Sequence, residues 1–454
     1  MIMPLTFIIF ISLASVPIGT LLALQSTMIT IERLVIADDL TGANDTGVHF
    51  LSDSENVEVV IDTDLFSMKV LDHSVHTLVI NTGTRNTEPR EAAEKVKSYV
   101  NHFLTYSPKE IYKKIDSTLR GNVGAEIDAL MTESGYSLAC VAPAVPRNGR
   151  TTVNGICYID GIPLYETEFA QDPFSPVRSS DAATIISGQS ERKIGVFTLE
   201  NLRAPRDNAL TALKEKVNDG CEILIVDSET REDLLLARNL FSLLDQKVLY
   251  VGAAGFFHAI GTKSIAKPQL CISHEPKILF VTGSMMETSK RQSDWLIDKK
   301  YINKTFPVIS RLAIFDENGE VTKIAQEVSE EFEHNPVALI HTDRDTREIA
   351  RTAQKIGMIV SRIVQEVIRR THIDVLVVTG GETAMNILSR LKVDSLHLID
   401  EALPAVPVSL MQSPENSELL FISKAGSYGN IDVLEGIITY LAQITTTNKT
   451  QENM

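Results

Sequence analysis

Residues 33–47 read RLVIADDLTGANDTG, an apolar run followed at once by two adjacent carboxylates, Asp38 and Asp39. An apolar, β-branched run of this length predicts a buried strand, and the residues after it predict a turn into a helix. In open α/β sheets ligands bind beyond the carboxyl ends of the strands, so the two carboxylates stand where chemistry is expected. Short carboxylates also form turns and cap helices, and that alternative is open for Asp38 and Asp45.

The alternation of short β-branched runs and helical patterns continues to about residue 262 and predicts a largely parallel sheet covered by helices. A β-hairpin is predicted for ICYIDGIPLY, because Asp-Gly supplies the positive φ angles of a tight turn. The expected strands are RLVIA, NVEVVI, HTLVIN, EIYKKI, LACVA, KIGVFTL, EILIVD and KVLYVG, and the expected helices span residues 90–106, 122–134, 206–218 and 232–244.

A second unit begins near CISHEPKILFVTG and continues through PVALIH, DVLVVTGG and LLFISKAGSYGN to a helix over residues 431–443. A chain of 454 residues is long enough for two or three domains. The predicted fold class is therefore α/β with two domains, each a largely parallel sheet flanked by helices, and with the β-hairpin inserted in the first. The domains are expected at residues 32–265 and 272–445.

An apolar leader occupies residues 1–31, and its first 27 residues contain no charged side chain. That stretch is long enough to span a membrane, but it lacks the basic start of a secretory signal. Met28 could itself be the first residue of the protein, since the first predicted strand follows it closely. We therefore keep two interpretations of the leader: its start codon is assigned too far upstream, or the leader is a membrane anchor. The expected location is cytoplasmic, with no membrane contact unless the leader is translated and anchors the protein.

The composition narrows the class of partner. A formal net charge of −16 argues against a nucleic-acid partner, because a phosphate backbone would be repelled. Four widely spaced cysteines without a CxxC pair predict reduced, buried thiols. The cysteines are Cys140, Cys157, Cys221 and Cys271.

Three histidines lack the spacing of metal ligands and are predicted to be surface or packing residues. These residues are His258, His274 and His372.

Polar residues also follow three other predicted strands of the first unit, HTLVIN, EIYKKI and LACVA. Their mixture of cations, carboxylates and hydroxyls suits a small polyhydroxylated acid. Arg85 or Lys114 would pair its carboxylate, while Asp39, Asp116 and Ser117 would bind or deprotonate its hydroxyls. The set at the strand ends is Thr84, Arg85 and Asn86, then Lys114, Asp116, Ser117, Thr118 and Arg120, then Pro146, Arg147 and Asn148.

The second unit predicts a nucleotide site. Two strands run into small-residue turns that open helices, at Gly283-Ser284 and at Gly380-Gly381, and a third loop reads SKAGSYGN. Glycine lets the backbone approach a ligand, and a helix N-terminus offers unpaired N–H groups to a phosphate. GFFHAIGTKS is not a Walker loop, because its lysine does not directly follow the glycine, and no GxGxxG follows a strand.

Taken together, ADDLTGANDTG, TGTRN, KKIDSTLRGNVGAE, APAVPRNGRTTVNG, VTGS and VTGGETA resemble the four-carbon acid sugar kinase family. The likeness covers about residues 33–442. It implies an ATP-dependent enzyme that phosphorylates the terminal hydroxyl of D-threonate, D-erythronate or 3-oxo-tetronate. KKIDSTLRGN is most similar to the threonate branch, so D-threonate is the expected substrate.

The resemblance also implies which residues touch the two substrates. The expected sugar-acid contacts are Asp39, Arg85, Lys114, Ile115, Asp116 and Ser117, and the expected ATP contacts are Ser284, Gly380, Gly381, Glu382, Lys424, Ala425, Gly426 and Ser427. Asp39 is the first candidate for the general base and Asp116 the second. Glu382 would either help to hold Mg²⁺ or favour the first turn of its helix.

The expected partners are a small sugar acid and ATP, with Mg²⁺ as cofactor, and a homo-oligomer is left open. The rival interpretation is a non-catalytic sugar-acid sensor, which would share the polar strand ends but have no use for the glycine turns. Binding of ATP separates the two hypotheses.

Overall fold

The computed structural model describes residues 31–52, 55–62, 66, 74–171, 175–261, 272–284, 286–308, 316–342, 346–413 and 416–451. The apolar leader before residue 31 and Cys271 therefore lie outside the described residues. Within them, none of the helices combines the length and the hydrophobicity that crossing a membrane requires. Cys140, Cys157 and Cys221 are free and buried, as predicted.

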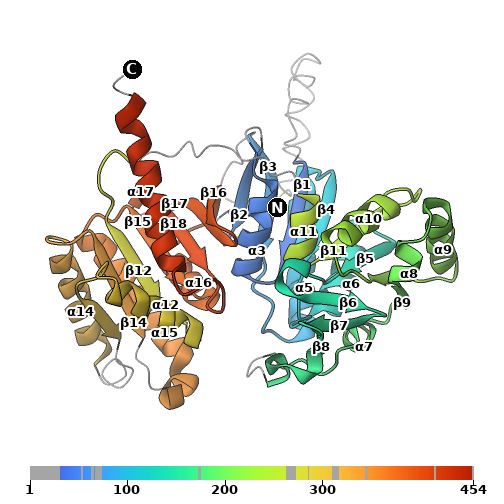
Figure 1. The fold of residues 1–454 in the computed structure, drawn as a ribbon, viewed down its shortest axis with the longest axis horizontal. Coiled ribbons are helices and arrows are strands. Elements are labelled where there is room, and N and C mark those ends of the chain that lie inside the picture. The colour runs from blue at the N-terminus through green and yellow to red at the C-terminus, as the bar shows by residue number, and fades with distance from the viewer. Residues whose placement is uncertain are drawn as a thin grey trace, which may run out of the picture.

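The first half of the chain carries the expected α/β alternation (Figure 1). Its strands are β1 (Arg33–Ala37), β2 (Asn56–Val60), β3 (Val75–Asn81), β4 (Glu110–Lys114), β5 (Leu138–Ala142), β9 (Ile194–Phe197), β10 (Ile223–Val226) and β11 (Val248–Gly252). Its helices are α3 (Leu40–Gly47), α5 (Pro89–Phe103), α6 (Val123–Ser134), α7 (Ala182–Ser187), α8 (Leu199–Leu202), α9 (Arg206–Asn218), α10 (Arg231–Phe241) and α11 (Ala254–Ile260). All eight predicted strands are confirmed.

The predicted hairpin is also confirmed, and it belongs to a small antiparallel sheet of β6 (Arg150–Val153), β7 (Ile156–Ile159) and β8 (Ile162–Pro163). Asp160 and Gly161 form its turn with φ angles of 50° and 80°. Both angles are in the left-handed region that a two-residue hairpin turn of this kind requires. The 3₁₀ turn η3 (Pro146–Asn148) connects β5 to this sheet.

The second half repeats the α/β pattern and adds a β-meander (Figure 1). Its strands are β12 (Ile278–Thr282), β13 (Thr305–Val308), β14 (Val337–Thr342), β15 (Val375–Thr379), β16 (Ser395–Leu403), β17 (Val406–Ser413) and β18 (Asn416–Lys424). Its helices are α12 (Glu287–Asp298), α14 (Glu317–Glu331), α15 (Thr346–Arg370), α16 (Gly381–Arg390) and α17 (Val433–Gln451). The sequence reading did not identify β13, β16 and β17. Pro307 in β13 is tolerated because that strand lies at the sheet edge.

The strands of the two halves form one sheet. Among the described residues, fifteen strands run in the order β13-β14-β12-β15-β18-β17-β16-β2-β3-β1-β4-β11-β5-β10-β9. All pairs are parallel except those that β16 and β17 make, and the antiparallel pair of β16 with β2 joins the halves. Figure 1 shows β2 and β16 side by side at this junction.

Both faces of the sheet are covered. Every residue of β5, β12 and β15 is buried, although successive side chains point to opposite faces. One hydrophobic cluster, which includes Val35 and Leu376, extends through both halves. Two separate clusters hold the alternate residues, one with Leu34 and the other with Phe280. The shared cluster and the β2–β16 pairing together fix how the two halves sit against each other.

Candidate active site

Five parallel strands of the first half, β3, β1, β4, β11 and β5, end at the same level. The register pairs Ala37 with both Asn81 and Lys114, and Gly252 with both Lys114 and Ala142. The polar residues that follow these strands therefore meet along one edge of the sheet, as the sequence predicts. We call this edge the acid-sugar edge, and it carries Asp38, Asp39, Arg85, Lys114, Ile115, Asp116 and Ser117.

Arg85 is the centre of the acid-sugar edge. Its Nε and Nη2 donate to the two carboxylate oxygens of Asp38 at 2.7 and 3.0 Å, and its Nη1 donates to Asp39 Oδ2 at 2.8 Å. Burial alone would lower the pKa of Arg85, but Asp38, Asp39 and Asp116 raise it well above its usual range. Arg85 is therefore bound to protein carboxylates, and it holds Asp39 in place.

Asp39 is the N-cap of α3. Its Oδ1 accepts the backbone N–H of Gly42 at 2.8 Å, while its Oδ2 pairs with Arg85. A Cβ atom at Gly42 would lie 2.7 Å from Asp39 Oδ1 and 2.9 Å from Lys114 Nζ, so a larger residue here would displace these two side chains. The capping role that the sequence leaves open for Asp38 and Asp45 thus belongs to Asp39, because Asp38 faces Arg85 and Asp45 lies inside the helix.

Asp116 is held by cations and a hydroxyl. Arg120 Nε donates to its Oδ2 at 2.9 Å, and Thr118 Oγ1 donates to the same oxygen. Burial alone would raise the pKa of Asp116, but Arg85 and Arg120 hold it well below its usual range. Asp116 is therefore ionised at neutral pH, and as a proton acceptor it is weak.

Lys114 of the acid-sugar edge and Arg150 beside it bind only neutral partners. Lys114 Nζ donates to the carbonyl of Ile115 at 2.9 Å, and Arg150 Nη1 donates to Ser117 Oγ. Ile115 contributes only its backbone, because its side chain is buried in the core. Among the described residues neither cation forms an ion pair, so both are available to an anionic ligand. Arg150 comes from the hairpin sheet, and sequence reasoning missed it.

Two arginines beside the acid-sugar edge, Arg120 and Arg150, lie near the same aromatic ring. The guanidinium carbons of Arg120 and Arg150 lie 5.2 and 5.4 Å from the centre of the Phe169 ring. A ring face attracts a cation within about 6 Å. Phe169 therefore fixes the two arginines in position. Phe169 follows the predicted hairpin in the sequence, and no motif marks it.

A buried ion pair lies behind the edge. Lys113 Nζ is 2.6 Å from Glu126 Oε2, and the two side chains are 0% and 1% exposed. Lys113 also donates to the carbonyl of Lys114 at 2.7 Å, and Glu126 Oε1 accepts the hydroxyl of Thr84 at 2.6 Å. The pair therefore joins β4, α6 and the loop after β3 beneath the residues that carry the chemistry.

The predicted nucleotide residues also meet at one edge. The register pairs Thr282 with Thr379, and Thr379 with Lys424, so β12, β15 and β18 end side by side. Gly380 N donates to the carbonyl of Lys424 at 2.8 Å, and Ser289 Oγ donates to the carbonyl of Gly426 at 2.6 Å. We call this the nucleotide edge, and it brings together Ser284, Gly380, Gly381, Glu382, Lys424, Ala425, Gly426 and Ser427.

Lys424 organises the third loop of the nucleotide edge. Its Nζ donates to the carbonyls of Ala425 and Tyr428 at 2.7 and 2.9 Å, and the residue is 2% exposed. Burial lowers the pKa of Lys424 to about 8. At neutral pH the ammonium is mostly charged, and a phosphate beside it would favour that charge further.

The two edges lie against each other. A Cβ atom at Gly381 would lie 2.7 Å from Thr41 Oγ1, so the N-terminus of α16 touches the first turn of α3. One turn farther along α3, Asn44 Nδ2 donates to Ser423 Oγ of β18 at 3.0 Å. A ligand on the nucleotide edge would therefore lie next to a ligand on the acid-sugar edge.

Asp45 lies at this junction. It is four residues after Thr41 and hence on the same face of α3. Its Oδ1 is buried and has no hydrogen-bond partner among the described residues. Burial raises the pKa of Asp45, and Lys114 and Arg147 offset only part of that effect. Asp45 is thus a carboxylate with a free oxygen and an increased proton affinity, a role that sequence reasoning did not assign to it.

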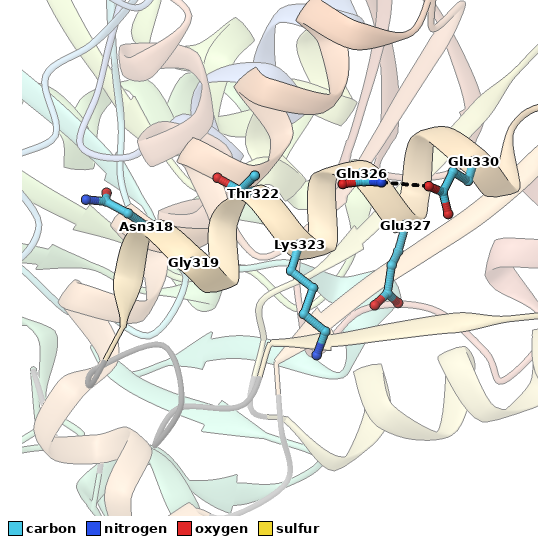
Figure 2. Close-up of a pocket in the computed structure, with 7 residues that line it drawn as sticks. All are labelled: Asn318, Gly319, Thr322, Lys323, Gln326, Glu327 and Glu330. Carbon is cyan, nitrogen blue, oxygen red and sulfur yellow. Dashed lines mark hydrogen bonds between the residues drawn. The ribbon is translucent and has the colours of Figure 1, made fainter.

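A surface depression of about 620 Å³ lies elsewhere, along α14 (Figure 2). The described residues that line it come from that one helix, and Figure 2 shows Gln326 bonded to Glu330 among them. None of them belongs to either edge. The depression therefore adds nothing to the candidate site.

Family models match each half of the chain. A family model described as a sugar-binding N-terminal domain matches residues 33–260, and one described as a nucleotide-binding C-terminal domain matches residues 279–434. The first covers the acid-sugar edge and the second covers the nucleotide edge.

Similar proteins span nearly the whole chain. A D-threonate kinase of Salmonella typhimurium is 30% identical over 91% of this chain and 99% of its own. A D-erythronate kinase of Heliobacterium modesticaldum is 26% identical over 90% and 96%. A 3-oxo-tetronate kinase of Haemophilus influenzae is 22% identical over 88% and 98%. A crystal structure of a Haemophilus influenzae protein, 19% identical, shares the fold with a TM-score of 0.70 over 90% of this chain and 100% of that one.

Proposed function

The chain belongs to the four-carbon acid sugar kinase family, and we propose that it transfers the γ-phosphoryl group of ATP to the terminal hydroxyl of D-threonate. As a family member it is a phosphotransferase that acts on an alcohol group of a four-carbon sugar acid. The observation that carries the proposal is the contact of Gly381 with Thr41, which sets the nucleotide edge beside the acid-sugar edge. The 30% identical D-threonate kinase supports this choice among the three acids.

The sugar acid would lie on the acid-sugar edge. Lys114 and Arg150 would pair its carboxylate, because both cations now bind only neutral oxygen atoms. Asp39, Asp116 and Ser117 would hold its hydroxyls by hydrogen bonds. Arg85, which the sequence offers for the carboxylate, would instead orient Asp39 through their ion pair.

ATP would lie on the nucleotide edge with its phosphates at the N-terminus of α16, where unpaired N–H groups favour anions. Ser284 and Lys424 would contact the phosphates from the neighbouring strand ends. Mg²⁺ in such sites is held by one or two carboxylates together with substrate phosphates, and the exposed Glu382 in the first turn of α16 fits that role. The bound ion would neutralise charge on the phosphates.

The transfer breaks the bond from the γ-phosphorus to the bridging oxygen of ADP and forms a bond from that phosphorus to the 4-hydroxyl oxygen. The hydroxyl proton goes to a carboxylate. The sequence favours Asp39 and then Asp116, but both oxygens of Asp39 are engaged and the pKa of Asp116 is low. We propose Asp45 as the acceptor, because its Oδ1 is free and its pKa is raised.

The substrate is tested by measuring ADP release from the full chain with MgATP and each of D-threonate, D-erythronate and 3-oxo-tetronate. We expect kcat/KM for D-threonate to exceed the others by at least about tenfold, because a misplaced hydroxyl leaves a buried polar group unpaired. Turnover of a different acid would change the substrate and keep the reaction. A folded protein that binds no ATP would favour the sensor.

We expect the affinity for ATP to fall as the pH rises above 8, because Lys424, whose pKa burial lowers to about 8, then loses its charge. The phosphates favour the ammonium, so ATP binding should take up a proton above this pH, and Kd should rise by up to about tenfold per pH unit. Calorimetry in buffers with different ionisation enthalpies measures the uptake. Lys424→Met should bind ATP more weakly and show no such uptake, and uptake that persists in this variant would assign the proton to another group.

Lys424 should affect stability in the same pH window. An exposed lysine in the unfolded chain has a pKa of about 10.4, so between about pH 8 and pH 10 the unfolded state binds more protons than the folded state. The contribution of Lys424 to the free energy of unfolding therefore increases as the pH rises through this window. This contribution is at its minimum below pH 8, where Lys424 is charged in both the folded and the unfolded state.

A further inference from the structure

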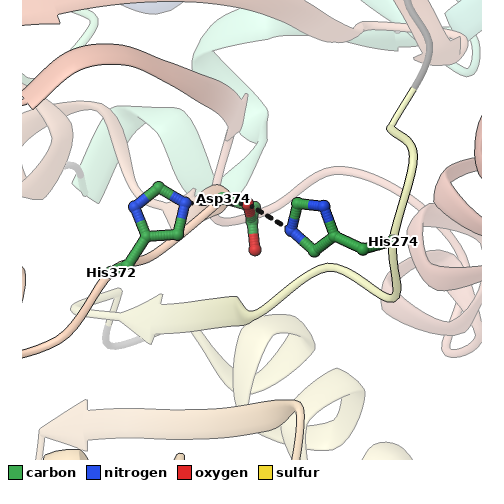
Figure 3. A group of neighbouring side chains, drawn as sticks. All are labelled: His274, His372 and Asp374. Atoms are coloured by element: carbon green, nitrogen blue, oxygen red, sulfur yellow. Dashed lines mark hydrogen bonds and ion pairs between the residues drawn. The ribbon is translucent and has the colours of Figure 1, made fainter.

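Two histidines and an aspartate meet at the surface of the second half (Figure 3). The Nε2 atoms of His274 and His372 lie 2.9 and 3.1 Å from the same oxygen, Oδ1 of Asp374. The histidine side chains are 57% and 68% exposed, as the sequence predicts for surface histidines, whereas that of Asp374 is 11% exposed. The sequence did not reveal that the two rings converge, because the histidines are far apart along the chain.

The cluster lies at the end of the sheet away from the active site. His274 precedes β12, and His372 and Asp374 precede β15, whereas Gly283 and Gly380 follow these strands. Five strand residues at about 3.3 Å each separate the two ends by roughly 16 Å. A ligand in the cluster could not touch the phosphates of ATP, so the cluster has a role separate from the transfer.

We propose that His274, His372 and Asp374 form a binding site for one divalent transition-metal ion of the zinc class. Two imidazole nitrogens and one carboxylate oxygen are ligands that Zn²⁺ accepts, whereas Mg²⁺ and Ca²⁺ prefer oxygen alone. The three ligand atoms lie within 4.8 Å of one another. The exposure of the rings leaves room for water to complete the coordination.

Two of the three distances between ligand atoms need only a small adjustment to admit the ion. Ligands about 2.0–2.2 Å from a tetrahedral Zn²⁺ are about 3.3–3.5 Å apart, a few tenths of an ångström more than the two nitrogen–oxygen distances here. The second carboxylate oxygen of Asp374 accepts the backbone N–H of Lys277 at 2.8 Å. This hydrogen bond orients Oδ1 toward the rings, as partners outside the coordination sphere do in metal sites.

An ion in this site would cross-link two segments of the second half. It would join the segment that leads into β12 to the segment that leads into β15, across about a hundred residues of chain. Because the ligands come together only in the folded protein, binding stabilises the second half. The ion would not take part in the transfer, so activity should be independent of it.

The test is calorimetric titration of the untagged, chelator-treated full chain with Zn²⁺ in excess Mg²⁺ and without ATP. We expect one equivalent to bind and the Tm to rise. His274→Ala and His372→Ala should each weaken binding by at least about tenfold and abolish the rise in Tm. His334→Ala removes an exposed histidine in the turn after α14, and this variant should bind Zn²⁺ like the wild type.

Co²⁺ gives a second readout. Bound to two imidazoles and a carboxylate, it should show visible absorption that Zn²⁺ displaces and that both histidine variants lose. The kcat of these variants should match the wild type, which shows that they fold. Absence of saturable Zn²⁺ binding, or equal affinity in the wild type and the two variants, would mean that the rings are merely hydrogen-bonded to Asp374 and would overturn the proposal.

Discussion

Replacing Asp45 by asparagine should lower kcat by about two to four orders of magnitude, the usual contribution of a positioned general base. Asparagine has the shape of aspartate but cannot accept the proton of the substrate hydroxyl. Asp45 Oδ1 is buried without a partner among the described residues, so its loss as a base leaves no other bond broken there. We therefore expect the KM values for ATP and the sugar acid to change little.

Asp39→Asn is the matched control. An asparagine can still accept the N–H of Gly42 as the cap of α3, but its ion pair with Arg85 is lost. We expect a higher KM for the sugar acid and a smaller fall in kcat than in Asp45→Asn. The opposite pattern, with Asp45→Asn active and Asp39→Asn inactive, would identify Asp39 as the base.

The pH dependence supplies an independent measurement. Burial raises the pKa of Asp45, so the acid limb of kcat/KM for the wild type should lie above the usual range of an aspartate. Below that pKa the carboxyl is protonated and cannot accept the proton. The limb should disappear from the residual activity of Asp45→Asn and persist in Asp39→Asn.

Local patterns were enough to predict the strands of the large sheet in the first half, because most of them are short β-branched runs that end in a turn. They also predicted both edges, since parallel strands bring their carboxyl ends together whatever their order. The single sheet was not predictable in this way. It depends on the pairing of β2 with β16, in which Val57 lies opposite Leu398, more than three hundred residues away.

The environment of each carboxylate could not be predicted from local sequence patterns either. Asp38, Asp39 and Asp45 are alike in the sequence, yet Arg85 binds the first two, whereas Glu401 of the second half is among the charges that act on Asp45. The pKa of Asp38 depends on Arg85 and that of Asp45 on Lys114 and Arg147, which come from other strand ends. The convergence of His274 and His372 has the same cause, because it follows from the neighbouring positions of β12 and β15 in the sheet.

Replacing Lys113 by methionine should lower the free energy of unfolding by about 3–5 kcal/mol, the usual result of removing one partner of a buried ion pair. Methionine fills the space of the lysine stem but leaves Glu126 buried without its cation. Burial already raises the pKa of Glu126, and without Lys113 its ionised form is less favourable still. Urea unfolding at neutral pH measures the loss.

Lys109→Met is the matched control for this change. Lys109 also pairs with a glutamate at 2.6 Å, but its side chain is 61% exposed and that of Glu32 is 38% exposed. An exposed pair contributes at most about 1 kcal/mol, so this variant should unfold close to the wild type. Equal losses in the two variants would show that the burial of the Lys113 pair has no energetic consequence.

The double variant Lys113→Met/Glu126→Gln separates two contributions to the free energy of unfolding. One is the cost of burying Glu126 without its cation, and the other is the net stabilisation by the ion pair. With both charges removed, much of the stability lost in Lys113→Met should return, because no ion is left buried without a partner. The hydrogen bond of Thr84 to residue 126 can persist with glutamine. Full stability without normal turnover would mean that the Lys113 ammonium, which binds the carbonyl of Lys114, is there to shape the acid-sugar edge. A double variant as unstable as the single one would instead make Lys113 necessary for the fold itself.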